Sequence, residues 1–191
     1  MSKSMNIKNI YQKYINQFPE EASNLELLVK QASDESADPT SRKNFVGHVT
    51  ASGFIVHAPT KRLLLLGHKM LGLFLQPGGH IEPEDVSLKQ AVLREVEEET
   101  GLKSEDLKLI PLLESDPAVP FDIDNCYIPA NDKKVEPEHY HHDCRLLFAT
   151  EKLDIKTDPN ESDGFKWVDL DEQAKQDGFG KVCKKIKRMI Y

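Results

Sequence analysis

The spacing of hydrophobic residues along the chain changes near position 45. Before it, apolar side chains recur every three or four residues up to Phe18, which predicts an amphipathic helix that ends at Pro19. Leu25, Leu28 and Val29 predict a second helix, and the polar residues 33–41 predict a connector. Residues 1–42 are too few to build a core, so we expect a helical extension packed on the larger C-terminal part of the chain.

From residue 45 the pattern is typical of strands. Two aliphatic segments, Phe45–Ala58 and Lys61–His68, flank Pro59-Thr60 and predict a β-hairpin. A glycine loop comes next, then a helix and a basic C-terminal helix from about Lys181. Further strands are predicted at Leu73–Leu75, Leu107–Leu113, Asp143–Ala149 and Phe165–Val168. Strands on either side of a helix, with hairpins among them, predict an α/β layered domain with a mixed sheet over residues 43–191.

Composition narrows the class of protein. The 191 residues carry 25 Lys and Arg against 32 Asp and Glu, a net charge of −7, which argues against a nucleic-acid-binding protein. Three scattered cysteines do not form a secreted disulfide framework. The longest aliphatic run, Leu63–Leu66, is far too short to span a membrane, and no signal peptide is apparent. We therefore expect a cytoplasmic protein, monomeric or homodimeric.

The helix over 88–100 has its boundaries written in the sequence. Ser87, with Gln90 three residues later, fits an N-terminal capping box, and Gly101 fits a C-terminal stop. At about 100° per residue, Leu88, Val92 and Val96 form an ordinary core-facing stripe.

Three carboxylates share an arc that overlaps this stripe. Glu95, Glu98 and Glu99 converge there, whereas Glu97 points away. Clustered carboxylates beside buried residues repel one another and resist desolvation, and negative charge at a helix C-terminus opposes the helix dipole. A bound cation would relieve both costs. Because every donor is a carboxylate oxygen, the fitting ion is hard, Mg²⁺ or Mn²⁺.

Two neighbouring features fit the same chemistry. Arg94 can brace one carboxylate by a bidentate contact. Gly78 and Gly79, upstream of the helix, allow a backbone to approach a phosphate closely. Carboxylates, a divalent metal and a glycine loop together indicate chemistry on a phosphate or pyrophosphate.

The segment from Gly78-Gly79-His80-Ile81-Glu82 to Arg94-Glu95-Val96-Glu97-Glu98-Glu99-Thr100-Gly101-Leu102 resembles the box of the Nudix hydrolases. Its second half, Arg-Glu-aliphatic-x-Glu-Glu-x-Gly-aliphatic, matches at every defined position. The first half departs from the family pattern, with Asp85 in place of a glutamate and one extra residue before Arg94. Glu82, Glu84 and Asp85 are the candidates for the first acid of the box.

The resemblance implies a Nudix-type α/β/α sandwich and a metal-dependent hydrolase of nucleoside diphosphates linked to another moiety. It assigns the metal to Glu95, Glu98 and Glu99, with the Gly78 carbonyl as a possible further ligand. Arg94 would orient a box carboxylate. The general base that activates water is either Glu95 or, in a polar loop, Glu161; a plain solvated acid is the alternative for Glu161.

A second cluster, Glu136–Cys144, is rich in histidine. If this segment is a strand, His139, His141 and Asp143 share one face, and His80 of the box loop would extend it into a nitrogen-rich pocket. We expect Gly79, His80, His139 and His141 to contact substrate, while proton transfer and an additional metal site stay open. The alternative is an exposed loop with histidines packed into the sheet.

Two other functions on the same fold compete with hydrolysis. A nucleotide sensor could dispense with metal ligands, so the presence of all three box glutamates favours catalysis. A prenyl diphosphate isomerase would need a catalytic thiol, for which Cys126 and Cys144 are candidates without a supporting motif. The basic C-terminal helix has an apolar stripe and is expected to dock on the sheet; an RNA contact is the minor alternative.

Overall fold

The computed structural model describes residues 5–34, 38–69, 71–132, 135–160, 162–176 and 178–191. Two helices, α1 (Ile7–Gln17) and α2 (Glu26–Ala32), precede the sheet and are joined by the 3₁₀ turn η1 (Pro19–Leu25). The later strands and helices are β1 (Gly47–His57), β2 (Arg62–His68), β3 (Leu73–Leu75), β4 (Gly78–His80), α3 (Leu88–Thr100), η2 (Ser104–Asp106), β5 (Lys108–Ile110), β6 (Asp122–Ile128), β7 (His139–Thr150), β8 (Ser162–Val168), α4 (Leu170–Gln173) and α5 (Gly180–Ile190).

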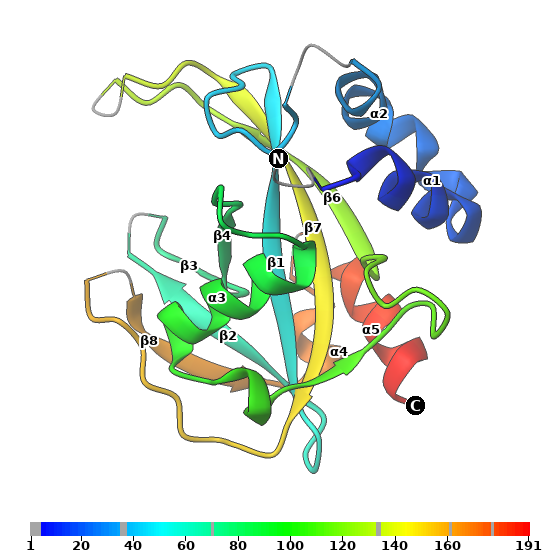
Figure 1. Ribbon diagram of the computed structural model, residues 1–191. Coiled ribbons are helices and arrows are strands. Elements are labelled where there is room, and N and C mark those ends of the chain that lie inside the picture. Colours follow the sequence, from blue (N-terminus) through cyan, green and yellow to red (C-terminus); the bar gives the residue numbers. More distant parts are fainter. Residues whose placement is uncertain (1–4, 35–37, 70, 133–134, 161, 177) are drawn as a thin grey trace.

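The described strands form one mixed sheet around the long pair β1 and β7 (Figure 1). These two run parallel, in register from Gly47 opposite Tyr140 to His57 opposite Thr150. On its other edge β1 pairs antiparallel with β4 at Thr50–Ser52 and with β2 at Val56 and His57. Strand β8 extends the sheet beyond β2, and both β5 and β6 pair with β7. The predicted hairpin of β1 and β2 is confirmed.

Helices cover both faces of the sheet, because successive side chains of a strand point to opposite faces. On one face, Val49 and Ala51 of β1 pack with Val92 and Val96 of α3, together with α1 and α2. On the other face, residues of β1, β2 and β7 pack with α5 and with Leu170 of α4. The prediction of an α/β sandwich with a mixed sheet and N-terminal helices is confirmed.

Two strands depart from the predicted pattern. Strand β6 was not predicted, because Asp122, Asp124 and Asn125 make it polar, and these residues lie at the edge of the sheet beside β7. Residues 78–80 were predicted as a loop but form the short strand β4. Glycine permits this pairing, since a Cβ atom at Gly78 would lie 2.6 Å from the carbonyl oxygen of Ala51. Gly78 also has a φ of +156°.

The N-terminal helices are attached to the rest by buried charge as well as by apolar contact. Lys185 of α5 lies 2.8 Å from Glu21 Oε1 and 2.7 Å from Asp122 Oδ1, and it donates to the hydroxyl of Tyr14 at 2.6 Å. The Tyr14 hydroxyl in turn donates to Glu21.

The domain boundary between residues 42 and 43 stays a prediction. Within the described residues, no helix is both long and apolar enough to cross a membrane.

Candidate active site

Helix α3 begins and ends where its sequence predicts. The Ser87 hydroxyl accepts a hydrogen bond from the Gln90 amide at 3.2 Å, and Gly101 ends the helix in the left-handed conformation with φ of +69°. The Gln90 side chain reaches back to the amide of Val86, one residue earlier than a capping box requires. These caps fix the rotation of α3 and therefore the direction of its carboxylates.

Two glutamates of the predicted arc, Glu95 and Glu99, contact β4. The Gly78 amide donates to Glu99 Oε2 at 2.8 Å. The carboxylate of Glu95 lies against Gly79, where a Cβ atom would come within 2.6 Å of Oε1. Glu98 is exposed and meets Arg94 at 3.2 Å, whereas Glu97 points into solvent. The glycine backbone and the box carboxylates therefore form one surface.

Arg94 holds this surface together. Its guanidinium donates to both oxygens of Asp85, at 3.4 and 2.9 Å, and to Glu95 Oε1 at 2.9 Å. It also donates to the carbonyl oxygen of His80 at 2.8 Å. The hydrogen bond to Asp85, followed by the contacts with Glu95, raises the pKa of Arg94 despite its burial. Arg94 is thus a positioning residue with a permanent charge.

Of the three candidates for the first acid of the box, Asp85 makes this contact. Its side chain is 2% exposed and also accepts the amide hydrogen of Glu82 at 2.9 Å. The shorter aspartate and the extra residue before Arg94 place a carboxylate against the guanidinium. Glu82 takes part in this network through its backbone amide, and among the described contacts of Arg94 none involves the side chain of Glu82 or Glu84.

The donor set fits a hard divalent cation. Glu95, Glu98 and Glu99 supply carboxylate oxygens from one helix, and Glu95 and Glu99 lie against the backbone of Gly79 and Gly78. Mg²⁺ keeps several waters and takes only a few protein ligands, which suits the open position of Glu98. Glu161, the other predicted base, lies outside the described residues.

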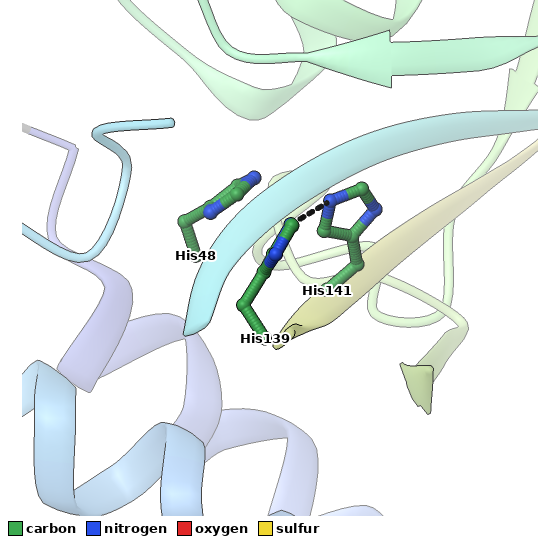
Figure 2. A group of neighbouring side chains, drawn as sticks. All are labelled: His48, His139 and His141. Carbon is green, nitrogen blue, oxygen red and sulfur yellow. Dashed lines mark hydrogen bonds between the residues drawn. The ribbon is translucent and has the colours of Figure 1, made fainter. Parts of the chain in front are cut away.

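Histidines converge on the opposite side of β4. His48 of β1 and His141 of β7 are register partners, and their ring centroids lie 4.7 Å apart. His139 stacks on His48 at 5.0 Å, and its Nε2 lies 3.1 Å from Nε2 of His141 (Figure 2). The His80 ring lies 5.2 Å from both His48 and His141. His80, His139 and His141 lie together as their positions in the sequence predict, whereas His48 was not predicted as a member of the cluster.

Burial lowers the pKa of two of these histidines, His48 and His141. Desolvation, followed by the neighbouring histidines, lowers the pKa of His141 to about 3. Desolvation also lowers the pKa of His48. The nitrogen lone pairs of both rings are therefore available to a ligand or a proton.

A buried polar chain continues the histidine row along β7. Asp143 accepts hydrogen bonds from the Ser52 hydroxyl at 2.7 Å and from Arg145 Nε at 2.8 Å. Arg145 also pairs with Asp122 and Asp124 of β6, at 2.9 and 2.8 Å. Burial alone would lower the pKa of Arg145, but the three carboxylates raise it. The alternation of charged residues in β6 and β7 was the available signal for this network.

The thiols that an isomerase would need are not activated. Cys144 is buried in the core, and burial raises its pKa. Burial, followed by the charge of Asp124, raises the pKa of Cys126 to about 12. Both thiols stay protonated at neutral pH, which is the opposite of what a reactive cysteine requires.

Comparison with known proteins agrees with this fold and motif. Residues 47–185 match the model of the NUDIX domain family. The chain therefore belongs to the NUDIX family, and the prediction of a member of this hydrolase family is confirmed. Among curated proteins, none matches the chain significantly.

Solved structures with the same fold come from several organisms. A NUDIX-family hydrolase from Clostridium perfringens has a TM-score of 0.56 and 21% identity, covering 74% of this chain and 97% of the other. An Ap4A hydrolase from C. elegans has a TM-score of 0.53 and 19% identity, covering 75% and 96%. The dihydroneopterin triphosphate pyrophosphohydrolase of E. coli has a TM-score of 0.56 and 19% identity, covering 74% and 94%. At these identities the likeness shows the fold.

Proposed function

We propose that the protein is a Mg²⁺- or Mn²⁺-dependent hydrolase that cleaves the pyrophosphate bond of a nucleoside diphosphate linked to another moiety. The observation that carries the proposal is the grouping of Glu95 and Glu99 against the backbone of Gly79 and Gly78, with Glu98 joined to Glu95 through Arg94. Two proteins of similar fold are named for hydrolysis of phosphate compounds, Ap4A and dihydroneopterin triphosphate. Their names support a nucleotide-like substrate here.

Each box residue then has a separate task. Glu95, Glu98 and Glu99 would hold the cation, with the Gly78 carbonyl as a further oxygen donor. When bound, the cation neutralises the diphosphate and makes water a better nucleophile. Arg94 bridges the carboxylates of Glu95 and Glu98 and ties them to the loop through its bond to the His80 carbonyl, so that they need not reorganise during the reaction.

The remaining residues are proposed to accept the proton of the attacking water and to contact the substrate. Glu95, or alternatively Glu161, would accept the proton of the attacking water. The backbone of Gly79, which lies against the Glu95 carboxylate, is proposed to contact the phosphate part of the substrate. His80, His139 and His141 are proposed to lie near the second moiety of the substrate, on the other side of β4.

The direct test is product release from a panel of nucleoside diphosphate derivatives, first with Mg²⁺, then with Mn²⁺, then with a chelator. The proposal expects hydrolysis that needs the metal and falls at least about 100-fold in Glu99→Gln. Glutamine can still accept the Gly78 hydrogen bond, so the loss reports the missing charge. If no substrate is hydrolysed although nucleotide still binds, the proposed enzyme would be wrong and a nucleotide sensor would be favoured. A cytoplasmic location and a monomeric or homodimeric state stay predictions.

A further inference from the structure

We propose that His48, His139 and His141 bind a divalent transition-metal ion of the Zn²⁺ type, at a site separate from the box carboxylates. Nothing in this inference depends on the hydrolase activity. The three residues come from two parallel strands, and one nitrogen of each lies within 4.8 Å of the others. Figure 2 shows the rings of His139 and His141 facing each other, with His48 beside them.

The first support is a nitrogen atom without a partner. His48 is only 1% exposed, and its buried Nε2 atom has no hydrogen-bond partner among the described residues. A buried polar atom of this kind normally has a partner, because an unsatisfied one costs about 1–3 kcal/mol. A hydrogen bond between His139 and His141 can satisfy those two rings, but it leaves His48 Nε2 alone. A metal ion would serve all three.

The second support is the way the rings are oriented. Nδ1 of His48 lies 3.2 Å from the carbonyl oxygen of Asn44, and Nδ1 of His139 lies 2.8 Å from that of Pro137. A carbonyl oxygen only accepts, so each Nδ1 carries the proton and each Nε2 keeps its lone pair. Metal-binding histidines are held in this way, with the second nitrogen donating to a backbone carbonyl or a carboxylate.

The spacing of the nitrogens fits coordination with a small adjustment. Ligand nitrogens about 2.0–2.1 Å from a tetrahedral ion lie roughly 3.3 Å apart. His139 Nε2 and His141 Nε2 are 3.1 Å apart, and the ligand nitrogen of His48 lies within 4.8 Å of those of the other two residues. Two of the three residues, His48 and His139, are buried, so the site is shielded from bulk water.

The chemistry of the donors selects the ion. Imidazole nitrogen suits Zn²⁺, Co²⁺, Ni²⁺, Cu²⁺ and Fe²⁺, whereas Mg²⁺ prefers oxygen. Three protein ligands leave a fourth position for water or a ligand, as in catalytic rather than structural zinc sites. The His80 ring of β4 lies 5.2 Å from the rings of His48 and His141, and the His80 carbonyl accepts a hydrogen bond from Arg94. The site thus adjoins the box through one strand.

Binding of Co²⁺ to the full chain tests the proposal, with excess Mg²⁺ present to occupy the box carboxylates. The wild type is expected to bind one Co²⁺ per chain, to show the visible absorption of a tetrahedral nitrogen-ligated ion, and to lose it to Zn²⁺. His48→Gln and His139→Gln should each weaken binding more than about 100-fold. His68→Gln, at an exposed histidine of β2 outside the cluster, and Glu98→Gln should bind as the wild type does.

Near-UV circular dichroism of the metal-free variants shows whether they fold. X-ray absorption of the Zn²⁺-loaded wild type gives a second measurement that needs no variant, and three imidazole ligands are the expected result. A first shell of oxygen atoms alone would overturn the proposal. So would binding that survives in His48→Gln and His139→Gln, or that disappears in Glu98→Gln. Activity on nucleotides enters none of these readouts.

Discussion

The backbone of Gly79 faces the carboxylate of Glu95 so closely that a Cβ atom there would lie 2.6 Å from Oε1 and 2.7 Å from Oε2. The atoms it would meet are the far end of a flexible side chain. A methyl group at this position would therefore move the carboxylate rather than the backbone. Such a shift costs little in folding but disturbs a group proposed to hold the cation.

Gly79→Ala should lower metal-dependent hydrolysis by about 10- to 100-fold, because misplacing a reacting group by about 1 Å has effects of this size. The thermal midpoint of unfolding should change little. Steady-state kinetics and a thermal melt measure the two quantities. Gly67→Ala is the matched control, since a Cβ atom there makes only ordinary contacts at 3.5 Å. Full activity in Gly79→Ala would contradict the role given to Glu95.

The residues of the site differ in how far the sequence reveals them. The shared direction of Glu95, Glu98 and Glu99 follows from the helical period, which is local. Which acid pairs with Arg94 depends on the path of the loop, so the sequence alone could not choose among the three candidate acids. The structure shows that the partner is Asp85. His48 joins His141 only through the parallel pairing of strands that are far apart in the chain. That pairing is not visible in local spacing.

At the level of helices and strands, the distance between α3 and the sheet is set by contact with β1. Gly53 lies under Val92 and Val96, where a Cβ atom would be 3.1 Å from Val92 Cγ1 and 2.7 Å from Val96 Cγ2. The absence of a side chain in the middle of β1 lets the helix pack closely. The box carboxylates reach β4 because α3 packs this close to the sheet.

Gly53→Ala should reduce the free energy of unfolding by about 1–3 kcal/mol, because the added methyl group overpacks this contact. Urea unfolding followed by circular dichroism measures the change. Val96→Ala makes room for the methyl group, so the double variant should lose less stability than the sum of the two single variants. Strict additivity would show that Gly53 and Val96 are not coupled.

Helices and strands with a clear hydrophobic pattern could be predicted from the sequence, whereas polar or glycine-rich strands could not. Strands β1 and β2 and the helix α3 were predicted, since their apolar periods are clear and their caps are explicit. Strand β6 was missed because its polar side chains are satisfied by Arg145 and Lys185, which only the folded sheet brings near. Strand β4 was missed because its pairing relies on glycine.

Across the whole molecule, Glu21 joins the N-terminal helices to α5. Its carboxylate lies 2.7 Å from Lys181 Nζ and 2.8 Å from Lys185 Nζ. Burial alone would raise the pKa of Glu21, but hydrogen bonds from these lysines and from Tyr14 outweigh it and hold the pKa below the ordinary value of 4.5. The folded protein thus binds the Glu21 proton more weakly than the unfolded chain does. The stability from this group is present above pH 4.5 and is lost as the pH falls below it.

Glu21→Gln should destabilise the protein by about 1–3 kcal/mol near neutral pH, because Lys185 stays buried with one carboxylate fewer. The variant should also lose less stability than the wild type as the pH falls below 4.5. Urea unfolding at a series of pH values measures both effects. Glu20→Gln, at the exposed neighbouring glutamate, is the control and should follow the wild type. A wild-type pH dependence in Glu21→Gln would contradict the assignment.

Glu98 and Glu97 test most directly whether the arc of Glu95, Glu98 and Glu99 on α3 holds a catalytic cation. They are adjacent, exposed glutamates of one helix that point in different directions. The decisive measurement is the rate of Mg²⁺-dependent pyrophosphate cleavage in Glu98→Gln and Glu97→Gln, compared with the wild type. We expect a loss of at least about 100-fold for Glu98→Gln, equal to about 2.7 kcal/mol of transition-state stabilisation, and a near wild-type rate for Glu97→Gln. Equal rates in the two variants would contradict the claim.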